Sequence, residues 1–355
     1  MTEPLPPGST IGILGGGQLG RMLSVAASRM GLACHIYEPA TGCPASQVAA
    51  HCTTAAYEDD AALEAFARSV DVVTYEFENV PTAALDRIEA IVPIRPGRRA
   101  LAVSQDRVNE KDFLSGLGLA TAPYAAVSSL DELKAALERI GTPAILKTRR
   151  FGYDGKGQAR LDDPSGAEAA FDAIAGAPSV LEGFVDFSLE ISVIGARGLD
   201  GAVVCFDPGA NEHRDGILHR TTVPAPIPSR LRTDAIILAG RILNALDYVG
   251  VLGVELFVTP AGLVVNEIAP RVHNSGHWTQ NACLTDQFEQ HMRAVAGWPL
   301  GDGSRHADAQ MLNLIGDEMD RWEELASEGA LHLYGKGGSR PGRKMGHVNR
   351  ITPRS

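Results

Sequence analysis

The sequence lacks long apolar runs and has little cysteine. No stretch approaches the ~20 consecutive apolar residues that a membrane-spanning helix needs, and the N-terminal MTEPLPPGST lacks the basic and apolar regions of a signal peptide. The five cysteines are odd in number and form no CxxC pair, so neither a disulfide framework nor a zinc knuckle is indicated. We therefore expect a cytoplasmic protein without a membrane partner.

Positive charge is also scarce. The formal net charge of −11 argues against a nucleic-acid partner, because phosphate backbones are bound through basic surface. Any phosphate bound by this chain must meet a local group of cations. The 355 residues, of which 45% are hydrophobic and 21% charged, indicate a globular protein of two or three domains.

Strand and helix signals alternate from the N-terminus. TIGIL (10–14), ACHIY (33–37) and VDVVTYEF (70–77) are typical of buried strands, and RMLSVAASRM (21–30) and AALEAFARSV (61–70) of the helices between them. This alternation predicts a doubly wound α/β domain over residues 1–103.

A second region begins near residue 104. Helices are predicted from Gln105 and over 130–140, and PAILK (143–147) and QARL (158–161) are predicted as strands. SLEISVIGARGLDGAVVCF (188–206) is typical of an antiparallel pair that turns at GLDG. A long helix over 230–246 and a second hairpin follow. We expect this domain to span 104–300, and a C-terminal segment to span 301–355.

The N-terminal glycine cluster permits two interpretations. Gly15, Gly17 and Gly20 satisfy G-x-G-x-x-G after a strand, and Glu38 ends the next strand, where a dinucleotide-binding fold has its ribose-binding acid. The alternative is a tight turn whose N–H groups bind another phosphate at the helix N-terminus. The motif alone does not separate them.

Two glutamates point to a metal. In VGVLGVELFVTPAGLVVNEIAP (249–270), a hairpin centred on Ala261 places Glu255 opposite Glu267. Opposed side chains on paired strands lie about 5 Å apart, and like charges there are destabilising unless neutralised. Magnesium held by two carboxylates and substrate phosphates satisfies this requirement. The alternative, a solvated pair, is disfavoured by the apolar flanking residues.

A loop rich in glycine and cations follows PAILK. Lys147 ends a buried strand, and TRRFGYDGKGQ (148–158) adds Arg149, Arg150 and Lys156 to backbone N–H groups that would wrap a polyphosphate. It is not a Walker A loop. A mobile hairpin tip with solvated cations is the alternative, but it explains neither Lys147 nor Asp154.

PAILKTRRFGYDGKGQ, LEGFVDFSLEISV, GVELFV and NEIAPRVHNSGHWT together resemble the ATP-grasp superfamily. With GILGGGQLGRM, TYEFENV and RPGRKMGHVN, the whole chain resembles the biotin-independent 5-(carboxyamino)imidazole ribonucleotide synthases of purine biosynthesis. The resemblance implies a Rossmann-like pre-ATP-grasp domain, an ATP-grasp domain with a mobile lid over about 125–182, and a small β-rich C-terminal segment that closes over the substrate. It also implies a homodimer.

That family uses ATP to activate bicarbonate as carboxyphosphate and transfers the carboxyl group to the amine of 5-aminoimidazole ribonucleotide. The resemblance implies Mg²⁺, or alternatively Mn²⁺, on Glu255 and Glu267. Glu182, Phe184 and Val185 would form the adenine hinge. The implied ATP-binding residues are Arg107, Lys147, Gly152, Tyr153, Asp154, Gly155, Lys156, Gly157, Gln158, Glu182, Phe184, Val185, Glu190, His213, Asn266 and Glu267.

By the same resemblance, the residues that contact the acceptor ribonucleotide are Gln18, Leu19, Glu76, Tyr153, Asp154, Asn274, Lys336, Arg343 and Lys344. The implied catalytic residues are Lys147, Asp154, Arg271 and His273. Arg271 would hold carboxyphosphate and stabilise charge that develops during transfer. HNSGH also permits zinc through His273 and His277, but Asn-Ser-Gly disfavours the usual helical pair, and a packed, hydrogen-bonded His277 is favoured. A solvated basic turn is the alternative for the tail cations.

The chain departs from the family at Phe151, where a glycine is expected, which predicts a stiffer lid. The main rival is a formate-dependent glycinamide ribonucleotide ligase of the same fold, against which EFENV and GHWTQNACLTDQFEQH favour the carboxylating family. A nicotinamide-dependent oxidoreductase is the alternative from another class. It leaves the pair of Glu255 and Glu267 unexplained.

Overall fold

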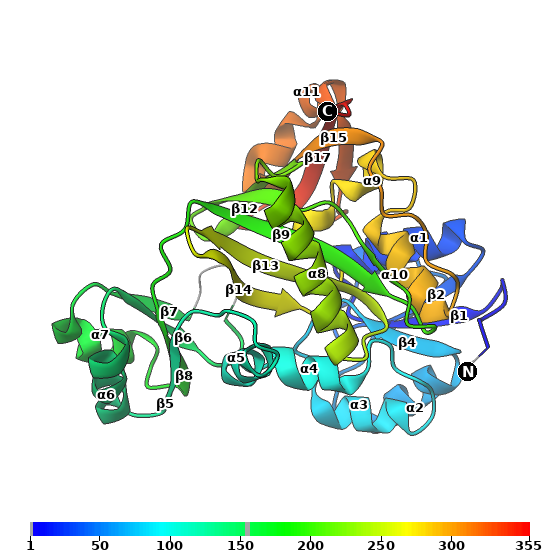
Figure 1. Ribbon diagram of the computed structural model, residues 1–355. Helices are drawn as coiled ribbons and strands as arrows, with labels where there is room; N and C mark the ends of the chain where they lie inside the picture. Colours follow the sequence, from blue (N-terminus) through cyan, green and yellow to red (C-terminus); the bar gives the residue numbers. More distant parts are fainter. Residues whose placement is uncertain (1–2, 153–156) are drawn as a thin grey trace.

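The computed structural model describes residues 3–152 and 157–355, which form three sheets (Figure 1). The first is a parallel sheet in the order β3-β2-β1-β4. Its strands are β1 (Thr10–Leu14), β2 (Ala33–Tyr37), β3 (His51–Thr53) and β4 (Val72–Tyr75). Its helices are α1 (Gln18–Arg29), α2 (Asp60–Arg68), α3 (Thr82–Glu89) and α4 (Arg98–Ser104). The predicted doubly wound domain is confirmed, although β4 stops before the EFEN segment.

The second sheet is a small antiparallel unit in the order β5-β8-β6-β7. Its strands are β5 (Tyr124–Val127), β6 (Ala144–Thr148), β7 (Gln158–Leu161) and β8 (Ser179–Gly183), and it carries α6 (Leu130–Ile140), α7 (Ala167–Ala173) and the short η2 (Pro164–Gly166). It has its own apolar core. The unit stands apart from the rest of the molecule (Figure 1). It covers the span predicted as the lid, and β6 and β7 form the predicted hairpin around the glycine loop.

The third sheet is antiparallel, in the order β14-β13-β9-β11-β12-β15-β17-β16, and β10 lies beside β9. Its first strands are β9 (Leu189–Arg197), β10 (Val203–Cys205), β11 (Gly209–Arg214), β12 (Ile217–Val223), β13 (Gly250–Thr259) and β14 (Gly262–Ala269). The C-terminal segment adds β15 (Ala307–Ile315), β16 (Ala330–Leu333) and β17 (Lys344–Pro353). The predicted C-terminal β-rich segment therefore extends the central sheet rather than forming a sheet of its own.

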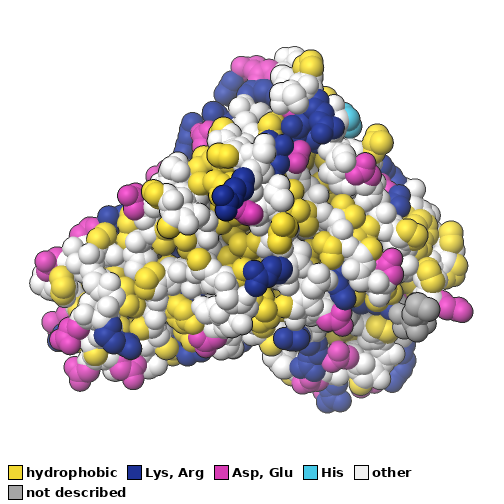
Figure 2. Space-filling view, in the orientation of Figure 1, with side chains coloured by type: hydrophobic (Ala, Val, Ile, Leu, Met, Phe, Trp, Pro, Cys, Tyr) yellow, Lys and Arg dark blue, Asp and Glu magenta, His cyan; other side chains and the backbone are white. Residues whose placement is uncertain are grey.

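The remaining helices are α5 (Arg107–Gly116), α8 (Ser229–Ala245), α9 (Thr279–Ala282), α10 (Gln287–Ala296) and α11 (Trp322–Glu328), with the short helices η1 (Pro44–Gln47), η3 (Asn274–Gly276) and η4 (Gly316–Arg321). Among the helices of the described residues, none has the length and apolar character that a bilayer crossing requires. Figure 2 shows acidic and basic side chains interspersed over one face, so the net negative charge is not gathered into a single patch there.

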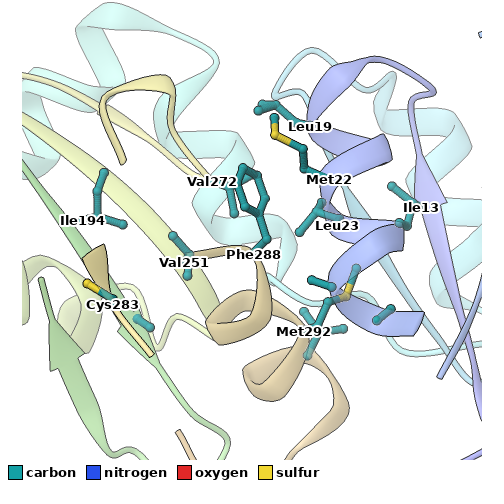
Figure 3. Packing of buried hydrophobic residues seen from close by; sticks show 14 of the residues in the cluster. Ile13, Leu19, Met22, Leu23, Ile194, Val251, Val272, Cys283, Phe288 and Met292 are labelled. Atoms are coloured by element: carbon teal, nitrogen blue, oxygen red, sulfur yellow. The ribbon is translucent and has the colours of Figure 1, made fainter. Parts of the chain in front are cut away.

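Helix α10 joins the N-terminal domain to the central sheet. Phe288 and Met292 pack with Met22 and Leu23 of α1 in one buried cluster (Figure 3). His291 adds a polar link, because its Nδ1 lies 3.1 Å from the backbone N of Val251, and its Nε2 lies 2.8 Å from the hydroxyl of Thr74 on β4. The two regions that line the site are thus held by one buried helix.

Candidate active site

A cleft of about 620 Å³ opens where the three sheets meet. The sequence-predicted residues that line it are Gln18, Leu19, Glu76, Arg107, Lys147, Gly152, Gln158, Glu190, His213, Glu255, Asn266, Glu267, Arg271, His273, Asn274 and Lys344. Gly157, Glu182, Phe184, Val185, Lys336 and Arg343 are not among the lining residues. Tyr153, Asp154, Gly155 and Lys156 lie outside the described residues. The structure therefore brings most of the described set together.

The hairpin β13–β14 places Glu255 opposite Glu267, as predicted. Its centre lies between Pro260 and Ala261 rather than on Ala261, because Thr259 pairs with Gly262. That turn alone would set Glu255 opposite Asn266. A bulge between Glu255 and Leu256 leaves Asn266 as the extra residue and restores the pairing of the two glutamates.

The two carboxyls have opposite electrostatic environments. Burial, followed by repulsion from Glu267, raises the pKa of Glu255 well above its usual range. Burial also acts to raise the pKa of Glu267, but attraction to Arg107 outweighs it and lowers that pKa to about 2. Arg107 Nη1 lies 2.9 Å from Glu267 Oε2. The pair therefore holds one ionised carboxylate beside a group that needs further positive charge to ionise.

Two lysines, Lys147 on β6 of the lid sheet and Lys111 on α5, share the carboxylate of Glu182. Glu182 Oε2 accepts from Lys147 Nζ at 2.9 Å, and Glu182 Oε1 lies 3.3 Å from Nζ of Lys111. Lys111 is 1% exposed and also donates to the carbonyl of Asn266, the bulge residue, at 3.3 Å. Sequence reasoning missed Lys111. Its spacing of four residues from Arg107 on one helix was the available signal.

Arg271 is held by a second missed residue, Glu78 of the EFENV segment. Arg271 Nε donates to Glu78 Oε2 at 2.7 Å. Burial acts to raise the pKa of Glu78, but attraction to Arg271 outweighs it and lowers the pKa. A third missed group is Glu110, which is buried in the cleft wall and accepts from the backbone N of Ile268 at 2.7 Å. Burial, with repulsion from Glu267, raises the pKa of Glu110 to about 8.

The N-terminal glycine turn is occupied by carboxylates of the chain itself. Gly16 N donates to Glu38 Oε2 at 2.8 Å, and Gly17 N and Gly20 N donate to the two carboxylate oxygens of Glu76. A Cβ on Gly17 would lie 2.6 Å from Glu76 Oε1, so a side chain there would displace this carboxylate from its present position. A phosphate cannot take N–H groups that these carboxylates hold. This geometry opposes both phosphate-binding interpretations of the turn.

His273 and His277 follow the hairpin on the segment that contains η3. His273 Nδ1 lies 2.8 Å from the hydroxyl of Ser275, and its Nε2 lies 3.4 Å from Glu255 Oε1. Burial, with a contribution from Arg271, lowers the pKa of His273 to about 3. His277 is 1% exposed and its Nδ1 lies 2.9 Å from the amide nitrogen of Gln287, so the predicted packed, hydrogen-bonded His277 is confirmed.

On the expected adenine and ribose side, the contacts are looser. Glu190 on β9 lies across the sheet from β11, with its Oε1 3.4 Å from Nδ1 of His213. Phe184 lies between β8 and β9, is 39% exposed, and stacks under the guanidinium of Arg160 at 4.6 Å. Val185, next to it, is half-buried. This strand connection is the junction between the lid and the central sheet.

Two residues shape the ends of the glycine loop. Thr148 N donates to the carbonyl of Gly157 at 2.8 Å, and Gly157 has a φ of 71°, the left-handed region that favours glycine. Phe151, found where the family resemblance leads us to expect glycine, has a φ of 63° and is 72% exposed. A bulky residue in that conformation is strained, which gives a physical reason for the glycine expected at this position.

The tail from Tyr334 to Lys344 forms a shaped turn rather than a solvated run. Lys336 Nζ donates to the carbonyl of Lys344 at 2.7 Å, and Arg343 Nη1 donates to the carbonyls of Gly337 and Gly338 at 2.7 and 2.9 Å. Lys344 lines the cleft. Burial, with repulsion from Arg343, lowers the pKa of Lys336 to about 8. Of the three predicted tail cations, Lys344 lines the cleft, whereas Lys336 and Arg343 do not.

Three segments of the chain match known domains. Residues 9–105 match the ribonucleotide synthetase preATP-grasp domain, residues 112–288 the ATP-grasp domain, and residues 309–355 the phosphoribosylaminoimidazole carboxylase C-terminal domain. The N5-carboxyaminoimidazole ribonucleotide synthase of Brucella melitensis biotype 1 is 54% identical over 356 residues, which cover 99% of this chain and 98% of that protein. The Bacillus subtilis protein of the same name is 41% identical over 96% of this chain and 91% of its own length.

Solved structures agree. An N5-carboxyaminoimidazole ribonucleotide synthetase in complex with ADP superimposes with a TM-score of 0.96 at 40% identity, over 99% of this chain and 94% of that one. The Aspergillus clavatus enzyme in complex with ADP and 5-aminoimidazole ribonucleotide gives a TM-score of 0.92 at 31% identity, over 98% of this chain and 95% of that one. The chain therefore belongs to the N5-carboxyaminoimidazole ribonucleotide synthases, which are ATP-grasp ligases of purine biosynthesis.

Proposed function

We propose that the protein uses ATP to activate bicarbonate as carboxyphosphate and transfers the carboxyl group to the amine of 5-aminoimidazole ribonucleotide, releasing ADP and phosphate. The observation that carries this proposal is that one cleft contains both a paired-glutamate hairpin beside Lys147 and a separate region built from the N-terminal turn and the tail. A dehydrogenase would need the glycine turn free for a pyrophosphate.

The nucleotide side fits a divalent cation. Glu255 and Glu267 supply the hard oxygen ligands that Mg²⁺ or Mn²⁺ accepts. Burial, with repulsion from Glu267, raises the pKa of Glu255, so this carboxyl needs a further positive charge to ionise. When bound, the cation would neutralise phosphate charge on ATP. Lys147, the loop from Gly152 to Gln158, Glu190 and His213 would bind the nucleotide. Its adenine would meet Glu182 near the end of β8, and Phe184 and Val185 in the connection to β9.

The acceptor side uses different groups. Gln18 and Leu19 at the start of α1 and Glu76, just after β4, line the cleft, and the ribose and imidazole of the acceptor would lie against them. The tail cations Lys336, Arg343 and Lys344 would hold its phosphate by charge-assisted contacts. Asn274, Tyr153 and Asp154 complete this side in the proposal.

Arg271 lies between the two substrates in this scheme. Its guanidinium, fixed by Glu78, would bind the carboxyphosphate oxygens and stabilise the charge that develops as the carboxyl group leaves. His273 is neutral at physiological pH because its pKa is lowered to about 3, so it acts as a hydrogen-bonding group that orients the acceptor rather than as a strong base. Asp154 would couple lid closure to the acceptor, and closure protects carboxyphosphate from water.

The decisive assay is phosphate release from ATP with bicarbonate and magnesium, measured with and without 5-aminoimidazole ribonucleotide. We expect strong stimulation by this acceptor. A parallel assay with formate and glycinamide ribonucleotide should show none, and stimulation only there would assign the protein to the formate-using ligases. Equilibrium dialysis should detect ATP but not NAD. We also propose, from the family resemblance, a cytoplasmic homodimer, which light scattering of the purified protein tests.

A further inference from the structure

The side chain of Gln287, the first residue of α10, clasps the segment that carries His273. Gln287 is fully buried. Its amide oxygen accepts from the backbone N of His273 at 2.9 Å, and its amide nitrogen donates to the carbonyl of the same residue at 2.8 Å. Both polar backbone groups of His273 are thus satisfied by one side chain, in the way that a neighbouring strand would satisfy them.

The same amide reaches a second histidine. Its nitrogen lies 2.9 Å from Nδ1 of His277. The backbone N–H of His273 can only donate, so the atom of Gln287 that faces it is the oxygen, and the atom that faces His277 is the NH₂ group. One hydrogen of that group goes to the carbonyl of His273, and the other is left for Nδ1. Nδ1 of His277 therefore accepts, and the ring proton of neutral His277 lies on Nε2.

Three observations make this clasp rigid. Gly276 allows it, because a Cβ there would lie 2.7 Å from the amide oxygen of Gln287. The backbone N of Gln287 donates to the hydroxyl of Thr279 at 3.1 Å, and that hydroxyl donates to the carbonyl of Gly276 at 2.7 Å. The next residue, Phe288, is buried between α1 and the sheet (Figure 3). The clasp is therefore anchored to the helix that joins the two substrate regions.

His277 lines the cleft, close to Tyr334, whose ring centroid lies 6.4 Å away. Within residues 3–152 and 157–355, no protein atom forms a hydrogen bond with its Nε2. Burial lowers the pKa of His277 well below its usual range, so the ring stays neutral. An Nε2–H group at this place is a neutral donor available to an oxygen or ring nitrogen of a bound substrate.

We propose that Gln287 is a positioning residue that fixes the backbone of His273 and holds His277 as the Nε2–H tautomer, so that His277 donates a hydrogen bond to substrate in the cleft. The inference rests on the proposed function, because it concerns the organisation of the same cleft. It assigns roles to Gln287 and His277, which belong neither to the glutamate hairpin nor to the groups of cations.

Helix α10 supplies a matched control. Gln290, one turn further along, is also fully buried and clasps a backbone in the same way. Its amide nitrogen donates to the carbonyl of Gly301 at 2.7 Å, and its amide oxygen accepts from Gly301 N at 2.8 Å. Gly301 does not line the cleft. Gln287→Met and Gln290→Met therefore remove similar buried hydrogen bonds, and only the first loosens the His273 segment.

The first test compares these two variants in ribonucleotide-stimulated phosphate release. We expect Gln287→Met to lower kcat by at least about tenfold, because small displacements of positioned groups are costly. Gln290→Met should leave kcat unchanged at a temperature where both variants are folded. Equal losses in both variants would reduce Gln287 to a structural residue. A parent enzyme without stimulation would instead contradict the proposed function, independently of this comparison.

The second test needs no activity. Nitrogen-15 NMR of the parent protein labelled at histidine should show His277, assigned through the contacts of its ring with Phe288 and Tyr334, as a single Nε2–H tautomer. In Gln287→Glu, a carboxylate can only accept from Nδ1, so the ring proton should move to Nδ1. An Nδ1–H tautomer or a mixture in the parent protein would overturn the proposal even if Gln287→Met were inactive or unfolded.

Discussion

The two substrate regions of the cleft hold their positive charge in different ways. On the nucleotide side, Lys111 and Lys147 share the carboxylate of Glu182, and Arg107 pairs with Glu267. On the acceptor side, Lys336 and Arg343 are held by backbone carbonyls, and no carboxylate of the described residues lies within salt-bridge distance of either.

The difference follows from burial. Lys111 is 1% exposed, and a charge taken that far from water must keep a counter-ion in every state of the protein. Lys336 and Arg343 in the tail are closer to solvent, so neutral carbonyls suffice to orient them. No carboxylate among residues 3–152 and 157–355 forms a salt bridge that cancels the charge of these two side chains. We infer that the nucleotide side is neutralised in advance, whereas Lys336 and Arg343 depend on the substrate phosphate for neutralisation.

The largest expected effect is on the nucleotide side. Glu267→Gln should lower turnover by more than about 100-fold, because it removes a metal ligand together with the partner of Arg107. The fold should change little, since the substitution is nearly isosteric. Phosphate release during a magnesium titration, with the melting temperature as control, tests this. Undiminished activity would remove the pair from the mechanism.

Alanine substitutions on the two sides of the cleft should raise KM for different substrates. Lys147→Ala should raise KM for ATP by about 10-fold to 100-fold, the value of one charge-assisted contact. Arg343→Ala should raise mainly KM for the ribonucleotide, and by less than Lys344→Ala, because Lys344 lines the cleft and Arg343 supports the turn behind it. If both tail variants changed only KM for ATP, the proposal that the tail binds the ribonucleotide would be wrong.

Lys336 should give the acceptor side a pH dependence. Lys336 has a pKa of about 8, so its ammonium is lost as the pH rises above this value. KM for the ribonucleotide should then rise by up to about tenfold per pH unit. A change in KM for ATP over the same range would instead report Glu110, whose pKa is raised to about 8. Lys336→Arg keeps its charge at all these pH values and should abolish the rise. An unchanged pH profile in that variant would exclude Lys336 as the source.

The smallest effect concerns the scaffold that both sides share. Burial lowers the pKa of His291 from 6.5 to about 3, so the folded protein binds fewer protons there than the unfolded chain. The contribution of His291 to stability is complete above pH 6.5 and falls by up to about 1.4 kcal/mol per pH unit as the pH drops toward 3. Urea unfolding at pH 7 and pH 5 measures it, and His291→Gln should reduce the slope.

The parts of this molecule that sequence predicts best are those set by local pattern. The strand and helix alternation, the hairpin around the glycine loop and the facing pair of Glu255 and Glu267 were all predicted correctly. The bulge at Asn266 was not predicted. A turn centred on Ala261 without a bulge, and a two-residue turn with a bulge, both place Glu255 opposite Glu267. The pairing of the two glutamates therefore cannot distinguish these two hairpins.

The missed residues depend on contacts between distant parts of the chain. Glu78 lies 193 positions before Arg271. Lys111 on α5 contacts Glu182 on β8 of the lid sheet. No spacing rule connects such pairs. The glycine turn shows the same limit, because its motif gives no sign that Glu38 and Glu76 already occupy its N–H groups. Local pattern predicted where chemistry gathers, but not which charges neutralise each other.

The continuation of the central sheet into β15 and β17 has a consequence for dissecting the chain. β15 pairs with β12 along Ala309–Leu312, so removal of the C-terminal segment would leave β12 as an open edge. Unpaired edge strands invite association with other chains. A fragment that ends near residue 300 should therefore aggregate rather than serve as a minimal ATP-binding unit. Domain exchange between related ligases should place its junctions in loops of the lid, and not just before the C-terminal segment that contributes β15 to β17.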